Sequence, residues 1–164
     1  KTVAQKKAEA VEKLAFIFRY TLKKSDRALV PLKDELSLVR TYLEIEQIRF
    51  GARLQVDISV EKALEEIEVP AFVVQTIIEN CIKHGIAKIM GQGIVRIAAE
   101  RRADHLQIDI EDNGPGIDKA KITTSTGLNN IITRLEQIYN EKELLLFENT
   151  GQGTLVSINI PLNL

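Results

Sequence analysis

Segments in which apolar and polar residues alternate constrain this fold most strongly, because successive side chains of a β-strand point to opposite faces of a sheet. Three such segments span residues 54–60, 94–100 and 106–110, and residues 144–147 and 155–160 are placed to form a hairpin across Thr150-Gly151-Gln152-Gly153. Strands with one apolar face need a covering layer. The chain therefore predicts an α+β two-layer sandwich, in which helices cover one face of a mixed β-sheet.

Four helical segments accompany these strands. We predict helices at residues 1–24, at 32–50 between Pro31 and Gly51, at 71–84 after Pro70, and at 127–140. Proline suits the first turn of a helix, and glycine suits its end. Because the first helix precedes the mixed region, we expect a helical arm at residues 1–30 and an α/β domain at residues 31–164.

The predicted arm carries an apolar stripe at steps of four and three residues, which is the spacing of a coiled coil or helical bundle. Its members are Ala4, Ala8, Val11, Ala15, Phe18 and Leu22. Two interpretations remain open. A partner helix from another chain or from a preceding segment covers the stripe, or the helix packs on its own domain.

The composition excludes several classes of protein. A net charge of −1, with 45% hydrophobic and 27% charged residues, argues against a disordered tail and against a nucleic-acid binder. The only cysteine, Cys81, permits no internal disulfide and suits a reducing compartment. No apolar run reaches the ~20 residues of a membrane helix, and no signal-peptide pattern is present. Because the chain opens at Lys1 and its only methionine is Met90, we expect a piece of a longer protein.

Three polar islands carry residues that can do chemistry. The first, at residues 79–85, reads Glu-Asn-Cys-Ile-Lys-His-Gly and ends the third predicted helix. One face of this helix presents Thr76, Asn80, Lys83 and His84. An amide oxygen, an ammonium group and an imidazole together can serve a metal–phosphate group. The alternative is a solvated polar face, with His84 complementing the helix dipole.

The second island, Asp112-Asn113-Gly114-Pro115-Gly116-Ile117, follows a predicted strand. Its glycines allow close approach to a flat ligand, and its carboxylate can accept a hydrogen bond from an amine such as that of adenine; a plain tight turn is the alternative. The third, Ser125-Thr126-Gly127-Leu128-Asn129-Asn130, begins the last helix, where N–H groups attract phosphate. Simple helix capping is the alternative there. Gly153-Thr154 adds a weaker fourth element.

In this order the islands resemble the ATP-binding domain shared by gyrase, Hsp90, histidine kinases and MutL, which has a Bergerat-type fold. Residues 79–85 are similar to its N box, residues 112–117 to its first glycine box, and residues 125–128 to its second. The chain has neither a P-loop nor a Rossmann fingerprint. The resemblance implies ATP as the substrate and Mg²⁺ as its companion ion.

Further motifs resemble LytS-type sensor histidine kinases over about residues 10–161. They are Phe18-Arg19-Tyr20, Pro31-Leu32-x-x-Glu35-Leu36, Tyr42-Leu43-Glu44-Ile45-Glu46, Arg49-Phe50-Gly51-x-Arg53-Leu54 and Arg134-Leu135. This resemblance implies the catalytic ATP-binding domain of such a kinase, with residues 1–30 as the second half of its dimerisation and phosphoacceptor bundle. It also implies a cytoplasmic domain of a bacterial plasma-membrane sensor, a homodimeric intact protein, and a response regulator as partner, often of the LytTR type.

The resemblance also assigns roles to single residues. Asn80 would bind Mg²⁺ through its side-chain oxygen, and Asp112 would hold the adenine amino group. The other residues of the predicted ATP site are Lys83 and His84 near the phosphates, Gly114 and Gly116 at the base pocket, Thr126, Gly127 and Leu128 as donors, Thr154 beneath the adenine, and Gly85, Ile117 and Ser125. Departures from the family pattern lie at the phosphate side: Ser125 replaces a usual glycine, Ile132 replaces a frequent basic residue, and the lid at residues 118–126 is short.

Two differences from related ATPases shape the expected activity. Gyrase, Hsp90 and MutL resemble one another in a glutamate four residues before the N-box asparagine, where this chain has Thr76; phosphate transfer is therefore favoured over hydrolysis. The acceptor histidine of LytS-like kinases lies in an upstream His-Phe-Leu-Phe-Asn segment, whereas this chain has only His84 and His105. We expect that the fragment lacks the acceptor. Alternatives are an ATP-hydrolysing clamp, a Ser/Thr kinase of the anti-sigma type, and a non-catalytic adenine-nucleotide binding module.

Overall fold

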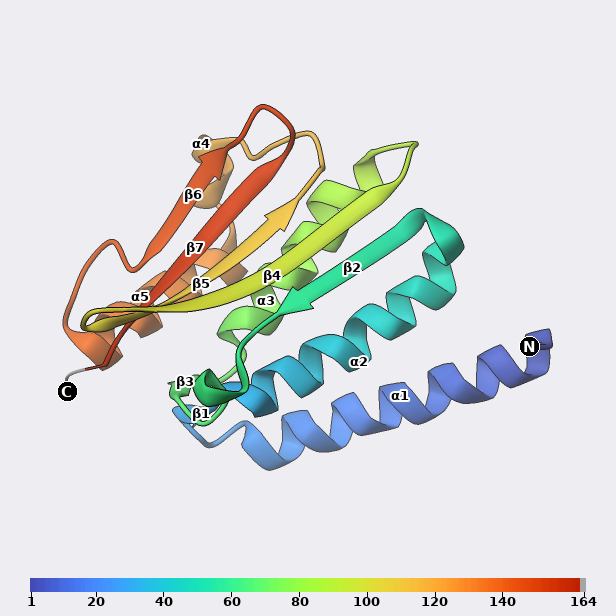
Figure 1. The fold of residues 1–164 in the computed structure, drawn as a ribbon, viewed down its shortest axis with the longest axis horizontal. Helices are drawn as coiled ribbons and strands as arrows, with labels where there is room; N and C mark the ends of the chain where they lie inside the picture. Colours follow the sequence, from blue (N-terminus) through green and yellow to red (C-terminus); the bar gives the residue numbers. More distant parts are fainter. Residues whose placement is uncertain (163–164) are drawn as a thin grey trace.

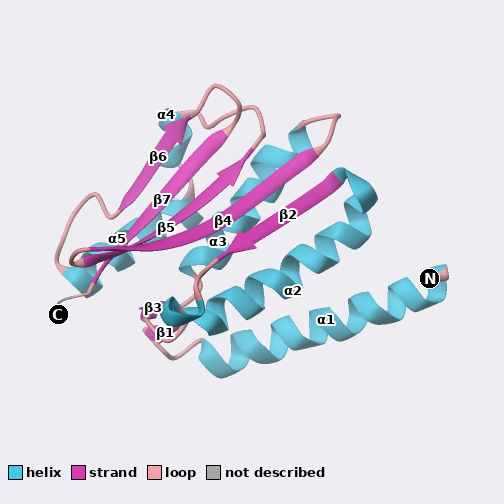
Figure 2. Cartoon of the chain, viewed as in Figure 1, coloured by secondary structure: helices cyan, strands magenta, loops and turns pink. Residues whose placement is uncertain are grey.

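The computed structural model describes residues 1–162, in which a helical arm leads into a region that mixes strands and helices (Figures 1 and 2). The helices are α1 (Val3–Lys24), α2 (Leu32–Phe50), α3 (Val73–Asn80), α4 (Lys119–Ile122) and α5 (Thr126–Tyr139). The strands are β1 (Leu29–Pro31), β2 (Leu54–Ser59), β3 (Glu68–Pro70), β4 (Gly93–Arg102), β5 (His105–Asp112), β6 (Leu145–Asn149) and β7 (Thr154–Pro161). A π-helical turn, η3 (Cys81–Gly85), continues α3 directly.

Five strands form one sheet in the spatial order β2-β4-β5-β7-β6. β2 runs parallel to β4, and the remaining neighbours are antiparallel, so the sheet is mixed. The register sets Ile110 of β5 between Ile97 of β4 and Val156 of β7. α3 and α5 lie behind this sheet in the view of Figure 2. The predicted two-layer sandwich with a preceding helical arm is confirmed.

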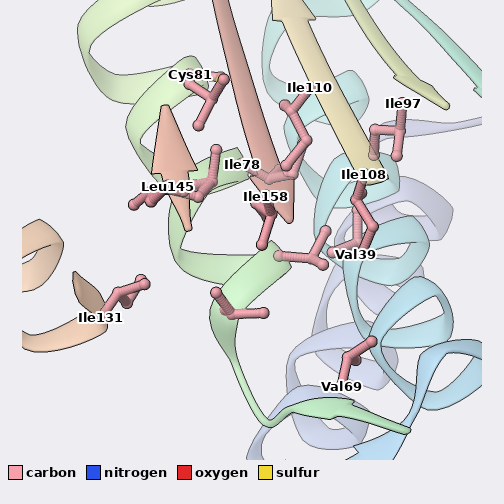
Figure 3. Close-up of a cluster of buried hydrophobic side chains, with 14 of the residues drawn as sticks. Val39, Val69, Ile78, Cys81, Ile97, Ile108, Ile110, Ile131, Leu145 and Ile158 are labelled. Carbon is pink, nitrogen blue, oxygen red and sulfur yellow. The ribbon is translucent and has the colours of Figure 1, made fainter. Parts of the chain in front are cut away.

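One hydrophobic cluster fills the space between the sheet and the helices. Ile78 of α3, Ile97 of β4, Ile108 of β5 and Ile158 of β7 are almost completely buried in it (Figure 3). Their contribution is large, because full burial of such a side chain is worth roughly 1.5–3 kcal/mol. The cluster holds α3 against the sheet and thereby positions the polar island at the end of that helix.

The arm α1 lies along α2, on the side away from the sheet (Figure 1). Phe16 and Tyr20 are partly buried, whereas Val11, Phe18 and Leu22 are 65%, 67% and 64% exposed. The helix therefore packs on its own domain through one face, while much of the predicted apolar stripe is uncovered in this chain. Among residues 1–162, no helix is both long and apolar enough to cross a membrane.

The structure corrects two local predictions and adds detail to a third segment. Pro70 ends β3 and does not open a helix, because residues 68–70 pair antiparallel with β1 in a separate two-stranded sheet. The helix predicted at residues 71–84 is α-helical only from Val73 to Asn80 and then widens into the π-helical turn. The polar lid at residues 118–126 contains a short helix, α4, whose N-cap Asp118 accepts a hydrogen bond from the backbone nitrogen of Ala120.

Candidate functional site

A cavity of about 790 Å³ opens between the end of α3, the carboxyl end of β5 and the segment that leads into α5. This volume lies in the range of ~300–1,000 Å³ that is typical of cofactor and ligand sites. Its lining residues come from segments far apart in the sequence: Ile77, Asn80, Cys81, His84, Gly85, Lys88, Asp112, Pro115, Gly116, Ile117, Asp118, Lys121, Ile122, Thr124, Ser125, Leu128, Phe147, Thr154 and Val156. The fold thus brings the separate sequence islands to one hollow.

Most of the residues predicted to bind ATP line this cavity. They are Asn80, His84, Gly85, Asp112, Gly116, Ile117, Ser125, Leu128 and Thr154. The predicted residues outside the lining are Lys83, Gly114, Thr126 and Gly127. Of these, Gly114 is buried beside Asp112, and the other three are exposed. The individual roles of all these residues stay predictions.

Asp112 is a buried carboxylate at the last position of β5, and only 5% of it is exposed. Its Oδ1 accepts a hydrogen bond from the backbone nitrogen of Gly114 at 2.8 Å. Burial raises the pKa of Asp112, and the Gly114 N–H and the nearby Cys81 thiol oppose that shift. Because a carboxylate has about four acceptor sites, it can still accept a hydrogen bond from a ligand amine.

Three glycines allow the backbone to close around Asp112. A Cβ on Gly114 would lie 2.5 Å from the Cα of Gly85, and a Cβ on Gly85 would lie 2.7 Å from Oδ1 of Asp112. A Cβ on Gly153 would lie 1.8 Å from the backbone oxygen of Asp112. In the next position, Thr154 of β7 pairs with Asp112 in the sheet register. Any side chain at these glycines would displace the carboxylate or the backbone that carries it.

Asn80 ends α3 with a defined side-chain orientation. Its Nδ2 donates to the backbone oxygen of Thr76 at 3.1 Å, which leaves Oδ1 as the acceptor of this amide. Amide oxygens are ligands that suit Mg²⁺. Within residues 1–162, no group of three or more His, Cys, Asp or Glu side chains could hold a metal ion.

A histidine and two lysines contribute to the lining of the cavity. His84, Lys88 and Lys121 belong to the lining. The pKa of His84 is lowered, first by its partial burial and then by the positive charges of Lys83, Lys88 and Lys121. The positive charges of Lys88 and Lys121 can attract an anionic ligand such as a polyphosphate. Sequence patterns did not single out Lys88 or Lys121; their only signal is that each stands within a few residues of an island.

The start of α5 borders the same cavity. The Oγ of Ser125 accepts a hydrogen bond from the backbone nitrogen of Leu128 at 3.4 Å, so Ser125 caps this helix. Capping was the alternative interpretation of this island, and it is the contact that the structure contains. The first N–H groups of the helix, at Thr126 and Gly127, have no partner one turn earlier by helix geometry. They can still donate to a bound anion.

Comparison with protein families divides the chain into two matched parts. Residues 1–54 match the family model for the histidine kinase, and residues 66–164 match the model for the histidine kinase-, DNA gyrase B-, and HSP90-like ATPase. The second match covers more than half of the chain. It contains all the islands that carry the predicted site.

Named relatives extend this likeness to most of the chain. The sensor histidine kinase BtsS of Escherichia coli K12 is 36% identical over 138 residues, which are 84% of this chain and 24% of BtsS. The sensor histidine kinase/phosphatase LytS of Staphylococcus aureus Mu50 is 33% identical over 164 residues, covering 92% of this chain and 28% of LytS. The chain thus spans about a quarter of the length of these relatives. The resemblance to LytS-type kinases is confirmed.

Solved structures support the same fold. The histidine kinase ThkA, in a crystal structure with the response regulator protein TrrA, matches with a TM-score of 0.57 at 20% sequence identity. The match covers 92% of this chain and 48% of that chain. At this identity the likeness concerns the fold alone.

Proposed function

This chain belongs to the family of histidine kinase-, DNA gyrase B-, and HSP90-like ATPases, and on this premise we propose that its cavity binds Mg·ATP for phosphate transfer. The chain is the ATP-binding catalytic domain of a histidine kinase. In the intact protein, the γ-phosphate would pass to a histidine outside this sequence. We retain the division into an arm at residues 1–30 and a catalytic domain at residues 31–164.

The single observation that carries the proposal is the shared cavity of Asp112 and Asn80. The buried carboxylate of Asp112 suits the exocyclic amine of adenine, since both hydrogen-bonding groups would then be paired away from water. The Oδ1 of Asn80 and the phosphate oxygens would hold Mg²⁺. When bound, this ion neutralises charge on the phosphates. Lys88, Lys121 and His84 would lie beside the same anionic part of the ligand.

The surroundings of Thr76 support transfer over hydrolysis. Its hydroxyl donates to the backbone oxygen of Phe72 at 2.9 Å, and it has no basicity comparable to a carboxylate. The neighbouring Glu79 is exposed, and its Oε1 accepts a hydrogen bond from Nε2 of Gln75 at 2.9 Å. Neither side chain is suited to activate a water molecule at Asn80. An ATP-hydrolysing clamp is therefore disfavoured.

Neither histidine of the sequence suits the role of phosphate acceptor. His84 lines the cavity itself. His105 begins β5, the strand that ends at Asp112, and its Nδ1 lies 2.7 Å from a carboxylate oxygen of Asp104. The match of residues 1–54 to the histidine kinase model also favours a histidine kinase over a Ser/Thr kinase of the anti-sigma type. The acceptor would lie on a helix that pairs with α1.

We extend the proposal to partners and location. The exposed stripe of α1 supports pairing within a dimerisation and phosphoacceptor bundle, and hence a homodimeric intact protein. The structural likeness to ThkA, solved with TrrA, supports a response regulator as the recipient of the phosphate. By resemblance to LytS-type kinases, that regulator would be of the LytTR type. The chain would form the cytoplasmic part of a plasma-membrane sensor.

Calorimetric titration with Mg·ATP, combined with incubation in γ-labelled ATP, tests this function. We expect saturable binding of one nucleotide and no acid-labile phosphohistidine on this chain. We also expect label on an added chain that contains the upstream acceptor segment. Absence of Mg·ATP binding would refute the nucleotide site, and phosphohistidine formed on this chain alone would refute the external acceptor.

A further inference from the structure

We propose that Glu35 is a positioning residue of the nucleotide site: it holds the start of α3 and thereby fixes Asn80 at the end of that helix. Glu35 lies in α2, is 0% exposed, and belongs to the Pro31-Leu32-x-x-Glu35 motif, to which the ATP site assigns no role. The expected effect of Glu35 on ATP binding rests on the proposed function. Its effect on α3 rests on contacts within the protein.

The carboxylate of Glu35 accepts hydrogen bonds from three backbone nitrogens at the start of α3. Oε1 accepts from Phe72 at 2.7 Å, and Oε2 accepts from Val74 at 3.2 Å and from Gln75 at 3.4 Å. These N–H groups belong to the N-cap and first turn, which have no partners inside the helix. Glu35 therefore acts as an N-cap supplied by another helix.

α3 depends on this outside cap because its own sequence provides none. The N-cap residue is Phe72, whose side chain has no hydrogen-bond acceptor, and the helix has no side-chain cap of its own. Phe72 also has φ 66°, a left-handed conformation that is unfavourable for a bulky residue. The α-helical part is only eight residues long before it widens into η3, so its own backbone hydrogen bonds contribute little stability. The contacts of Glu35 thus determine where α3 begins and how it is oriented.

A line of hydrogen bonds connects this start with Asn80. The Oγ1 of Thr76 donates to the backbone oxygen of Phe72 at 2.9 Å, and the Nδ2 of Asn80 donates to the backbone oxygen of Thr76 at 3.1 Å. Phe72 is therefore held through its nitrogen by Glu35 and through its oxygen by Thr76. A shift at the start of α3 would be transmitted along the helix to the side-chain oxygen of Asn80.

Other helices converge on the same junction. Arg134 of α5 donates to the backbone oxygen of Ala71 and interacts electrostatically with Glu35. The ring of Tyr20 in α1 packs edge-on against Phe72, with ring centroids 6.0 Å apart. The arm, α2 and α5 therefore meet where α3 begins. Glu35 is the member of this junction that bonds directly to the start of α3 through three backbone groups.

The test compares Glu35→Gln with Leu38→Ala in this chain. Leu38 is buried in the same helix, so its truncation controls for a general loss of stability. We expect Glu35→Gln to weaken Mg·ATP binding about tenfold and to accelerate amide hydrogen exchange at residues 72–80 more than in the rest of the core, because an amide keeps only one of the two acceptor oxygens that Glu35 uses. Leu38→Ala should lower the unfolding temperature and accelerate exchange no more in α3 than in the rest of the core, while ATP affinity stays near that of the parent chain. If Glu35→Gln does not fold, Glu35→Asp takes its place, since its shorter side chain keeps the carboxyl group and loses reach.

The outcomes separate this inference from the proposed function. A Glu35 variant with unchanged exchange across α3, or with ATP affinity equal to that of Leu38→Ala at matched stability, would overturn the positioning role. If the parent chain itself binds no Mg·ATP, the proposed nucleotide site fails. Hydrogen exchange then still decides whether Glu35 holds α3.

Discussion

The side chain of Asp112, which lines the cavity, and the buried backbone nitrogen of Gly114 are joined by a 2.8 Å hydrogen bond. The turn that contains Gly114 therefore holds the side chain of Asp112, the last residue of β5. Gly85 lies close to the same carboxylate, and Gly153 lies close to the backbone oxygen of Asp112. Asp112 is thus oriented by the fold before a ligand binds, and such preorganisation lowers the entropic cost of binding.

Replacing Asp112 tests the adenine contact directly. We expect Asp112→Asn to weaken ATP binding by ~1–3 kcal/mol, or about five- to 150-fold in Kd, because the amide leaves a buried group without its partner. Isothermal calorimetry measures this change. Asp109→Asn is the matched control, since Asp109 lies in the same strand but bonds Gln107 and Ser157 away from the cavity. Unchanged affinity of the Asp112 variant would remove it from the site.

Gly114→Ala tests the close backbone approach at the cavity. The added Cβ would lie 2.5 Å from the Cα of Gly85 and 2.8 Å from Oδ1 of Asp112. We expect a loss of ~1–3 kcal/mol in the free energy of unfolding from this overpacking, together with weaker ATP binding. Urea unfolding measures the first effect. Gly91→Ala, whose Cβ would meet nothing within 4 Å, should leave both properties unchanged; equal behaviour of the two variants would contradict the packing.

The buried carboxylate of Glu35 makes stability depend on pH. Burial raises its pKa from an ordinary 4.5 to about 7, against the lowering effects of the three backbone N–H groups and of Arg134. The unfolded chain therefore loses this proton at lower pH than the folded chain does. The contribution of Glu35 to stability is fully present below about pH 4.5 and is lost as the pH rises to about 7.

Glu35→Gln isolates this dependence, because glutamine does not titrate. Between pH 5 and 7.5, we expect the parent chain to lose up to about 3 kcal/mol of unfolding free energy relative to the variant. Urea unfolding at both pH values gives the difference. Tyr20 of α1 and Asp34 of α2 are nearby titratable groups. The parent chain and the Glu35→Gln variant both contain them, so their contributions to the pH dependence cancel in the comparison. A constant difference across this range would contradict the raised pKa.

Much of the fold was predictable because a sheet with one covered face imposes a period of two on its strands. The alternation at Ile108 and Ile110 carries that signal, with Gln107 and Asp109 facing the other side. β1 and β3 could not be predicted in this way. Each has only three residues, too few to show a period, and the pair joins positions as distant as Leu29 and Pro70.

The site was predictable to the extent that its residues stand in recognisable islands. Asn80 and Asp112 belong to such islands, and the fold brings both to one cavity. Lys88 and Lys121 come from connecting segments whose position depends on tertiary packing. The contact of Glu35 with Phe72 also left no sequence signal, because a glutamate within an amphipathic helix is usually solvated. Capping across 37 residues becomes visible only in three dimensions.

Because the hydroxyl of Tyr20 has no partner within residues 1–162, we predict that Tyr20→Phe does not destabilise the protein. It is buried and has no hydrogen-bond partner among the described residues, while its ring packs on Phe72. We expect Tyr20→Phe to leave the free energy of unfolding unchanged or to raise it by about 1 kcal/mol, because it removes an unpaired polar group and keeps the ring. Differential scanning calorimetry measures the effect. A loss of stability would mean that the hydroxyl is bonded in solution.

Phe18 tests the proposed pairing role of the arm. It is 67% exposed on α1, as are the nearby Val11 and Leu22 at 65% and 64%, so an aspartate at position 18 costs the folded chain little. In a helical bundle the same aspartate would be buried without a partner, which is strongly unfavourable. Phe18→Asp should therefore weaken self-association while ATP affinity stays unchanged, because Phe18 does not line the cavity. Sedimentation equilibrium and calorimetry measure the two properties, with Arg19→Ser as the exposed control. Equal loss of both properties would contradict a separate role for the arm, and unchanged self-association would contradict pairing through this stripe.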